Sequence, residues 1–273
     1  MVTFVLTCDE PPPPVSLAKH GLGLVIAFSI IALVDLPLRK VFSDAKVRWF
    51  ALHFLVNMVV TIGCLADLGG VARAPLCSFV DATSSWQPSY FGFSLHFYHL
   101  SCFSSLRRED LVHHILFGGC LGCFNFLLMW GRMTNLLILF MTGLPGGIDY
   151  AMLVLVKTGR LQRLTQKSIT SSINTWLRAP GHVFTASLMV ICLWQGTIAI
   201  PYPYFTVCPV AGLCLLNGLY YGEQAVGSFH RMAALAPTYA DKQAGLVDPP
   251  DSHVDAYPVE ALSTDASGRS KLG

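Results

Sequence analysis

Long apolar segments alternate with short polar stretches along this chain. A transmembrane helix needs about 20 consecutive, mainly apolar residues, and seven segments meet that requirement. They are residues 19–41, 47–67, 88–106, 110–130, 132–157, 180–200 and 202–223. The pattern predicts an all-α fold, a polytopic membrane helix bundle of about seven transmembrane helices.

The composition agrees with that fold class. Of the 273 residues, 53% are hydrophobic and 12% are charged, with a mean hydropathy of +0.54, whereas soluble domains carry about 25% charged residues. The net charge of +2 gives no basic surface of the kind that binds nucleic acid. We therefore expect an integral membrane protein without a nucleic-acid partner.

Basic residues fall mainly in every second loop. Only Lys19, Arg73 and Arg132, of the 18 Lys and Arg residues, lie on the side that holds few positive charges. Loops rich in Lys and Arg stay in the cytosol. The distribution predicts a lumenal or extracellular N-terminus and a cytosolic C-terminus.

The two ends of the chain differ from its apolar middle. Residues 1–18 are Pro-rich and have no basic n-region, so we expect an uncleaved first helix, which with its loop covers residues 19–47. Residues 48–229 hold the other spans. Residues 230–273 are rich in Asp, Pro, Ala and Ser, and predict a disordered tail.

The cysteines are mostly inside spans and are interpreted as small apolar residues. Cys120 and Cys123 form a C-x-x-C pattern within lipid, without a second pair for zinc. Cys8 and Cys77 both fall on the lumenal side, where an oxidising compartment would allow them to pair. We expect no metal site, with a mononuclear zinc site from intramembrane histidines as the remaining alternative.

Ionisable groups inside spans are costly, so each is a candidate functional group, with packing as the alternative. Asp35 lies four residues before Arg39, which predicts an ion pair within one helix. His53 stands alone on its span and is interpreted as a hydrogen-bonded packing histidine.

Three successive spans place further titratable groups at a similar depth. They are His96 and His99, then Asp110, His113 and His114, and then Asp149. His113 and His114 lie about 5 to 6 Å past Asp110, which begins its span, His99 lies about 10 Å and Asp149 about 12 Å from the cytosolic end of its predicted helix, and His96 lies about one turn deeper than His99. We expect them in the cytosolic half of the bilayer, either as one shared site or as separate structural hydrogen bonds.

The fourth span carries two patterns. Asp110 can reach His113 or His114 one turn later and would orient an imidazole. His114 also shares a helix face with Gly118, Gly122 and Asn125. Such a stripe of small residues either admits a neighbouring helix or leaves room for a slender ligand, such as an acyl chain.

The fifth span is interrupted by Gly143-Leu144-Pro145-Gly146-Gly147. Proline removes a backbone donor, and irregular backbone at this depth persists only against protein or a wet cavity. Pro145 and Gly146 therefore mark either a lipid-binding cavity above Asp149 or a covered kink.

Residues 158–178 are basic and amphipathic, which predicts an interfacial helix on the cytosolic side. Its charges would attract anionic headgroups or acyl-CoA to a nearby site. Ordinary positive-inside charge is the other interpretation.

The run from Arg108 to His114, followed by Asp149 and Lys157, resembles the TLC-domain family, which includes ceramide synthases and translocating-chain-associating proteins. The resemblance covers about residues 48–223 and implies a lipid-facing cavity within a helical bundle. It matches His113 and His114 to the family's His-His pair, and Asp149 to the last Asp of its H-D-x-x-D motif. Pro145 and Gly146 stand where that motif has its first His and Asp, and neither can exchange a proton.

The resemblance implies a protein of the endoplasmic reticulum that binds or regulates a membrane lipid or acyl chain, without a cofactor. The alternative is an acyl-CoA-dependent N-acyltransferase resembling ceramide synthase. In that enzyme His113 or His114 would act as general base or acyl acceptor, with Asp110 orienting it and Asp149 or His99 assisting.

Overall fold

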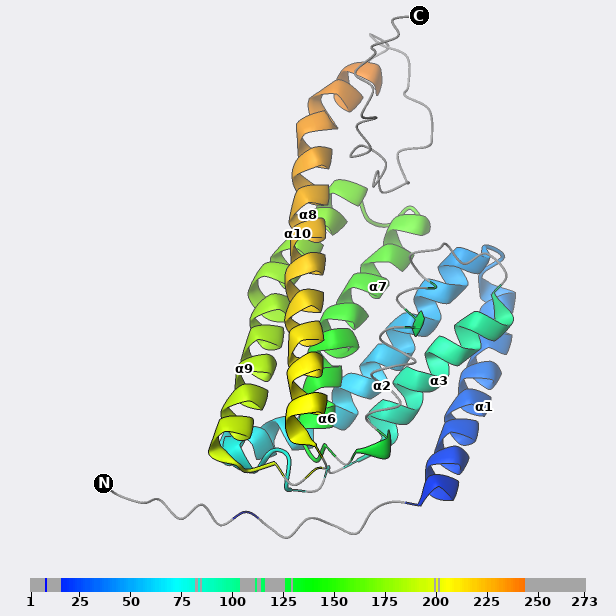
Figure 1. Ribbon diagram of the computed structural model, residues 1–273. Helices are drawn as coiled ribbons and strands as arrows, with labels where there is room; N and C mark the ends of the chain where they lie inside the picture. Colours follow the sequence, from blue (N-terminus) through cyan, green and yellow to red (C-terminus); the bar gives the residue numbers. More distant parts are fainter. Residues whose placement is uncertain are drawn as a thin grey trace, which may run out of the picture. The chain divides into compact units, whose positions relative to one another are not determined.

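A computed structural model describes residues 8, 16–81, 83, 85–103, 111, 114–115, 126–128, 130–198, 200 and 202–243. Within these ranges the chain consists of helices and loops, with no β-strand (Figure 1). By its contacts the chain divides into two units, Met1–His230 and Arg231–Gly273. The sites below belong to the first unit, and the last helix of the chain begins in it and continues past His230.

The elements follow one another in a simple order. They are α1 (Leu17–Val41), α2 (Ala45–Arg73), η1 (Pro75–Cys77), α3 (Gln87–Cys102), α6 (Met133–Ile138), η3 (Leu139–Gly143), α7 (Leu144–Lys157), α8 (Arg163–Ile173), η4 (Asn174–Arg178), α9 (Ala179–Gln195) and α10 (Pro203–Gln243). Elements η3 and η4 are π turns, and η1 is a turn of 3₁₀ helix.

Five helices in the described part of the chain are long and apolar enough to cross a membrane. They are Leu17–Val41, Ala45–Arg73, Met133–Lys157, Arg163–Gln195 and Pro203–Leu235. They correspond to the first, second, fifth, sixth and seventh predicted spans. The all-helical, multi-pass prediction is therefore confirmed, whereas the count of seven is not established.

The third and fourth predicted spans account for the difference. Helix α3 has only 16 residues, fewer than the roughly 20 that a crossing needs. Of the fourth span the structure describes only a few residues. Two of them are separated along the bundle, because His114 contacts α3 near its last turn whereas Phe126 packs against Trp86, just before α3 begins.

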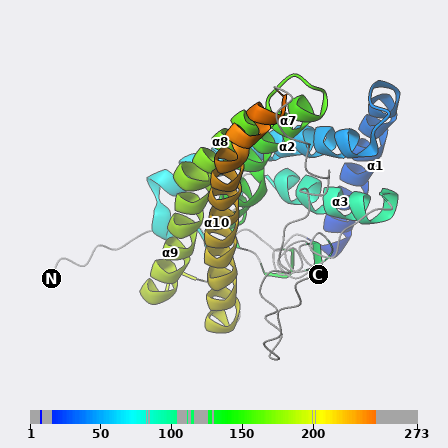
Figure 2. The same ribbon diagram turned by 90° about the horizontal axis from the view of Figure 1, so that it is seen from above.

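The bundle has two distinct ends. Among the described residues, basic residues cluster where α1 and α7 end and where α2 and α8 begin, and we call this the basic end. The opposite end carries a disulfide between Cys8 and Cys77, with a Cα–Cα distance of 5.3 Å, and we call it the disulfide end. Figures 1 and 2 show α1, α2 and α3 together on one side of the first unit, with α9 and α10 side by side on the other.

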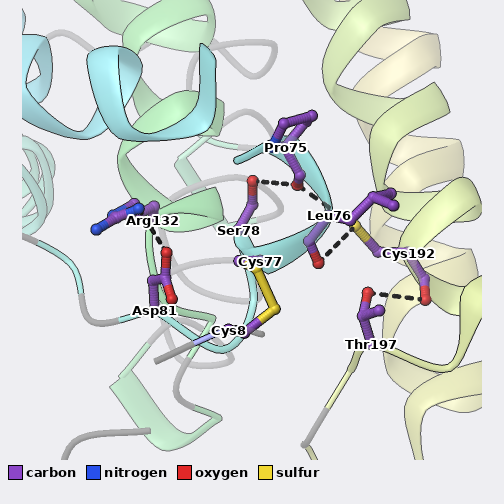
Figure 3. Close-up of a disulfide and its surroundings, with 9 residues drawn as sticks. All are labelled: Cys8, Pro75, Leu76, Cys77, Ser78, Asp81, Arg132, Cys192 and Thr197. Carbon is purple, nitrogen blue, oxygen red and sulfur yellow. Dashed lines mark hydrogen bonds and ion pairs between the residues drawn. A yellow bond between two sulfur atoms is a disulfide. The ribbon is translucent and has the colours of Figure 1, made fainter. Parts of the chain in front are cut away.

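Polar contacts fix the loop at the disulfide end. Buried Asp67 of α2 accepts hydrogen bonds from Asn135 Nδ2 at 2.6 Å and Thr83 Oγ1 at 2.7 Å, and Arg132 pairs with Asp81 at 2.5 Å. Figure 3 shows the disulfide beside this ion pair and beside the Cys192 thiol, which faces the carbonyls of Pro75 and Leu76. The N-terminal segment is thus joined to a loop that is already anchored to α2, α6 and α9.

Apolar side chains cover the outside of the helices as well as the core. Ile62, Trp194 and Phe205 are 70%, 83% and 83% exposed, as expected of surfaces that face lipid rather than water. Inside, one cluster joins α6, α9 and α10 around Met133, Met189 and Val207, and a second joins α1, α2 and α3.

Two helices remain continuous where the sequence predicted an interruption. In the fifth span the π turn η3 is followed directly by Pro145 near the start of α7, and in the sixth span η4 is followed by Pro180 near the start of α9. A π turn is wider than an α turn, which accommodates the proline ring and its missing N–H.

This continuity changes one boundary. Residues 163–173 of the predicted interfacial helix form α8, which continues through η4 into α9, so they begin a 33-residue helix. The predicted start of the sixth span at residue 180 was wrong because Pro180 lies within the helix rather than ahead of it.

The glycine-rich segment of the fifth span packs closely on α2. A Cβ at Gly143 would lie 3.3 Å from Thr61 Oγ1, and one at Gly147 would clash with the end of Met58. Gly143 ends the π turn η3, residues 144–147 begin α7, and α2 packs against the segment.

The last helix is longer than predicted. Helix α10 extends to Gln243 rather than ending near residue 223, so residues 230–243 of the predicted disordered tail are helical. Residues 232–236, Met-Ala-Ala-Leu-Ala, are strong helix formers that let the helix continue. Residues 244–273 lie outside the described residues.

Candidate functional site

Histidines from different segments meet near the basic end of the bundle. His99 Nδ1 of α3 lies 2.8 Å from His114 Nε2, and both residues are buried. The His96 ring centroid lies 4.8 Å from that of His114. At a hydrogen-bonded pair of imidazole nitrogens one ring donates and the other accepts, so His99 and His114 share one proton between them.

A fourth imidazole extends this group. His53 of α2 has its ring centroid 5.7 Å from that of His99 and 4.4 Å from that of Tyr150 on α7. We call His53, His96, His99 and His114 the imidazole cluster. It connects α2, α3, α7 and the segment that carries His114.

The partners of His53 define its protonation. Its Nδ1 lies 3.0 Å from the Trp49 carbonyl oxygen, which can only accept, and its Nε2 lies 3.0 Å from the Trp49 indole N–H, which can only donate. The ring is therefore the neutral Nδ1–H tautomer. A second proton on Nε2 would displace the indole, so His53 is held by its own helix and supports its neighbours by packing.

His96 is also oriented by its own helix. Its Nδ1–H donates to the Gly92 carbonyl at 2.8 Å, one turn earlier on α3. This bond turns the ring so that its plane lies nearly at right angles to that of His114.

Aromatic rings enclose the cluster. The Trp49 ring centroid lies 3.7 Å from that of His99, and the Phe103 centroid lies 5.4 Å from it. Apolar walls of this kind strengthen a hydrogen bond between buried imidazoles, because water does not compete for the shared proton.

Among the described residues, no group of three or more His, Cys, Asp or Glu side chains is arranged to hold a metal ion. Both ring nitrogens of His53 are engaged by Trp49, and Nδ1 of His96 is engaged by Gly92.

Asp149 belongs to a different polar group. Its Oδ1 accepts hydrogen bonds from Gln166 Nε2 at 3.0 Å and from the Thr170 hydroxyl, both on α8. Successive helical residues point about 100° apart, so Tyr150 faces the imidazole cluster while Asp149 faces α8. The predicted grouping therefore divides: His96, His99 and His114 come together, and Asp149 does not join them.

The other predicted site residues fall into two sets. Pro145 and Gly146 are buried at the start of α7, where Gly146 faces Asn57 of α2. Asp110, His113, Gly118, Gly122 and Asn125 lie outside the described residues.

The sequence interpretation missed His53 and Trp49 as part of the cluster. Both lie on one face of α2, since they are four residues apart. Counting from Ala45 places His53 about 12 Å along its helix, the depth already derived for Asp149. That count was the available signal, but His53 stands alone on its span and was interpreted as packing.

A second group of polar residues lies near the basic end. Asp35 of α1 pairs with Arg39 at 2.7 Å, which confirms the predicted ion pair, and it also contacts Arg48 of α2 at 3.0 Å and accepts from the Tyr98 hydroxyl at 2.8 Å. The carboxylate is fully buried, so it joins three helices rather than reaching the surface.

No protein-family model, curated protein or solved structure matches this chain.

Proposed function

We propose that this multi-pass membrane protein binds a membrane lipid, with the polar headgroup at the imidazole cluster and the acyl chain between the helices. The observation that carries the proposal is the buried hydrogen bond between His99 and His114. Ionisable groups inside a membrane protein are costly to maintain, so they are retained mainly where they serve a ligand or proton path.

The chemistry of the cluster suits a lipid headgroup. Either ring of the His99–His114 pair can be the donor, depending on the tautomers, so the pair can present either a donor or an acceptor to a hydroxyl, amine or carbonyl group. Trp49 and Phe103 beside it offer apolar surface to the first carbons of a chain. The stripe of Gly118 and Gly122 is where we propose the chain continues.

The location follows from the charge distribution and the family resemblance. We propose that the basic end faces the cytosol, that the cluster lies in the cytosolic half of the bilayer, and that the membrane is the endoplasmic reticulum. The TLC-domain resemblance remains part of this proposal, with the His113-His114 pair on the same segment as the cluster.

The proposal is tested by the lipids that co-purify with the protein. We expect mass spectrometry to find a lipid class enriched with the wild type over the surrounding membrane, and reduced about tenfold or more in a His99→Ala/His114→Ala variant, because a buried polar partner is lost. A His20→Phe variant is the control, since His20 lies at the disulfide end beside Tyr90. Equal enrichment in all three proteins would refute the proposal.

An acyl-CoA-dependent N-acyltransferase is the second candidate, because a hydrogen-bonded imidazole pair can relay a proton. An amine nitrogen would attack the thioester carbonyl, the C–N bond would form as the C–S bond breaks, and the amine proton would pass through His99 and His114 to the leaving thiolate. Labelled palmitoyl-CoA with a long-chain amine separates the candidates. Amide formation by the wild type, abolished by His114→Ala, would replace the binding role by catalysis.

A further inference from the structure

Arg178, which lies in the π turn η4, has its side chain at mid-height of the bundle. Its guanidinium faces Gly146 of the fifth span, beside Asn57 of the second. Measured along the helices that hold them, all three residues lie at least about 16 Å from either end. An arginine at such a depth is costly unless something neutralises its charge.

The described residues give the Arg178 guanidinium few hydrogen-bond acceptors and no ion-pair partner. Its Nη1 donates to Asn174 Oδ1 at 3.2 Å, and its Nε is fully enclosed and has no hydrogen-bond partner. No carboxylate in the described part of the chain lies within ion-pair distance of Arg178. Asp149 is near enough to interact electrostatically, but its Oδ1 is occupied by Gln166 and Thr170.

A buried amide points to the same place. Asn57 is 3% exposed, and its side-chain amide lies against Gly146. A Cβ at Gly146 would lie 2.8 Å from Asn57 Nδ2 and 3.8 Å from Arg178 Nη2. Both N–H groups therefore border Gly146, where the absence of a side chain allows their close approach.

The backbone around Gly146 and Arg178 departs from regular α-helix. The π turns η3 and η4 touch each other, and each is followed at once by a helix whose second residue is proline. π turns inside α-helices are rare and occur frequently at functional sites. Here η3 leads to Gly146, and η4 carries Arg178 itself.

We propose that Arg178 and Asn57 bind an oxyanion, a carboxylate or phosphate, over Gly146. The Nε and Nη2 edge of a guanidinium matches two oxygens of such a group, and the Asn57 amide supplies a further donor. The anion completes the neutralisation that Asp149 does not provide by direct contact. This site is separate from the imidazole cluster and does not depend on the function proposed for it.

Trp49, His53 and Asn57 are spaced four residues apart and share one face of α2, so polar groups extend from the basic end toward mid-height. The anion belongs either to a lipid with a single acidic headgroup or to a small soluble molecule, and the two differ in whether an acyl chain adds to binding.

The test measures anion binding by calorimetry with the full chain in nanodiscs of zwitterionic lipid. The probes are oleate, acetate and inorganic phosphate. We expect saturable binding of at least one probe, weakened about tenfold or more by Arg178→Gln, because a charge-assisted hydrogen bond is lost. Binding of oleate without acetate identifies a lipid acid, whereas binding of acetate or phosphate identifies a soluble anion. Absence of binding, or wild-type affinity in Arg178→Gln, overturns the proposal.

Two further variants keep the test decisive if Arg178→Gln unfolds. Asn57→Asp introduces an internal carboxylate beside Arg178, and Gly146→Ala adds a methyl group between the two donors, so both should also weaken binding about tenfold or more. Gly147→Ala is the matched control, because its methyl clashes with the flexible end of Met58 and meets Asn57 Cβ at an ordinary contact distance of 3.5 Å. Thermal unfolding verifies that each protein is folded. Equal affinities for the Gly146→Ala and Gly147→Ala proteins contradict the assigned site.

Discussion

At the scale of single residues, Asp35 illustrates how much one buried group can hold together. It lies between the guanidinium groups of Arg39 and Arg48 and accepts a hydrogen bond from Tyr98. Three helices therefore meet at one carboxylate. Removing its charge leaves two cations facing each other next to a buried hydroxyl, which is unfavourable even though part of Arg39 reaches solvent.

We expect Asp35→Asn to lower stability by about 1–3 kcal/mol, since a hydrogen-bonded charge is lost from a buried position. Arg39→Ala should cost less, because the Arg39 side chain is 50% exposed and exposed ion pairs contribute little. Thermal unfolding in detergent measures both variants. A larger loss for Arg39→Ala than for Asp35→Asn would contradict this account.

Single residues also show which contacts the sequence could predict and which it could not. The pairing of Asp35 with Arg39 follows from spacing within one helix, whereas the contacts of Asp35 with Arg48 and Tyr98 depend on which helices are neighbours. Depth counting aligned His99 and His114 correctly. It placed Asp149 with them wrongly, because depth along a helix does not reveal which side of the helix a residue faces.

At the scale of elements, the sequence predicted some features of the two helices that contain a π turn and a proline, and missed others. Gly143 to Gly147 indicated an irregularity from sequence alone, and the structure has one there. The form of the irregularity depends on α2, whose side chains pack against the glycines. No sequence pattern in residues 158–178 predicted that α8 continues through η4, since prolines usually end helices.

The contact between the fifth and sixth spans gives a prediction at this scale. A Cβ at Gly181 of α9 would clash with the Phe140 ring of η3. We expect Gly181→Ala to destabilise the protein by about 1–3 kcal/mol, as overpacking of a rigid contact does.

The matched control for that variant is Gly212→Ala on α10, because nothing lies within 4 Å of its added methyl. This substitution should be neutral or slightly stabilising, since alanine favours helix over glycine. Thermal unfolding compares the two proteins, and similar losses for both would show that the Phe140 contact does not limit packing.

At the scale of the whole molecule, apolar length and basic loops predicted a helical membrane bundle, and the long helices agree. The lengths of α3 and α8 could not be predicted in the same way, because tertiary contacts decide where these helices end. Trp49 and His99 pack together although 50 residues separate them, and no local pattern encodes that contact.

The disulfide gives a prediction for the whole chain. Closing a loop of about 70 residues restricts the unfolded state, and such bonds typically contribute about 2–4 kcal/mol. We expect Cys8→Ser to lower the unfolding temperature and to remove the shift in gel mobility that reduction causes in the wild type. In a protein whose single remaining cysteine is Cys102, which is exposed where α3 ends at the basic end, a membrane-impermeant maleimide should label intact vesicles from the cytosolic side only. Labelling from the lumenal side would reverse the orientation derived from the basic loops.

The π turn at Leu139–Gly143 holds one residue more than the α-helical path it replaces, and its wider winding absorbs that residue. Deleting one residue there would return the segment to α winding and leave the rotational phase of α7 nearly unchanged. Tyr150 would stay against His53, and Asp149 would stay against Gln166 and Thr170. Homologous chains that lack one residue in this turn would therefore present the same side chains to both polar sites while keeping the same bundle.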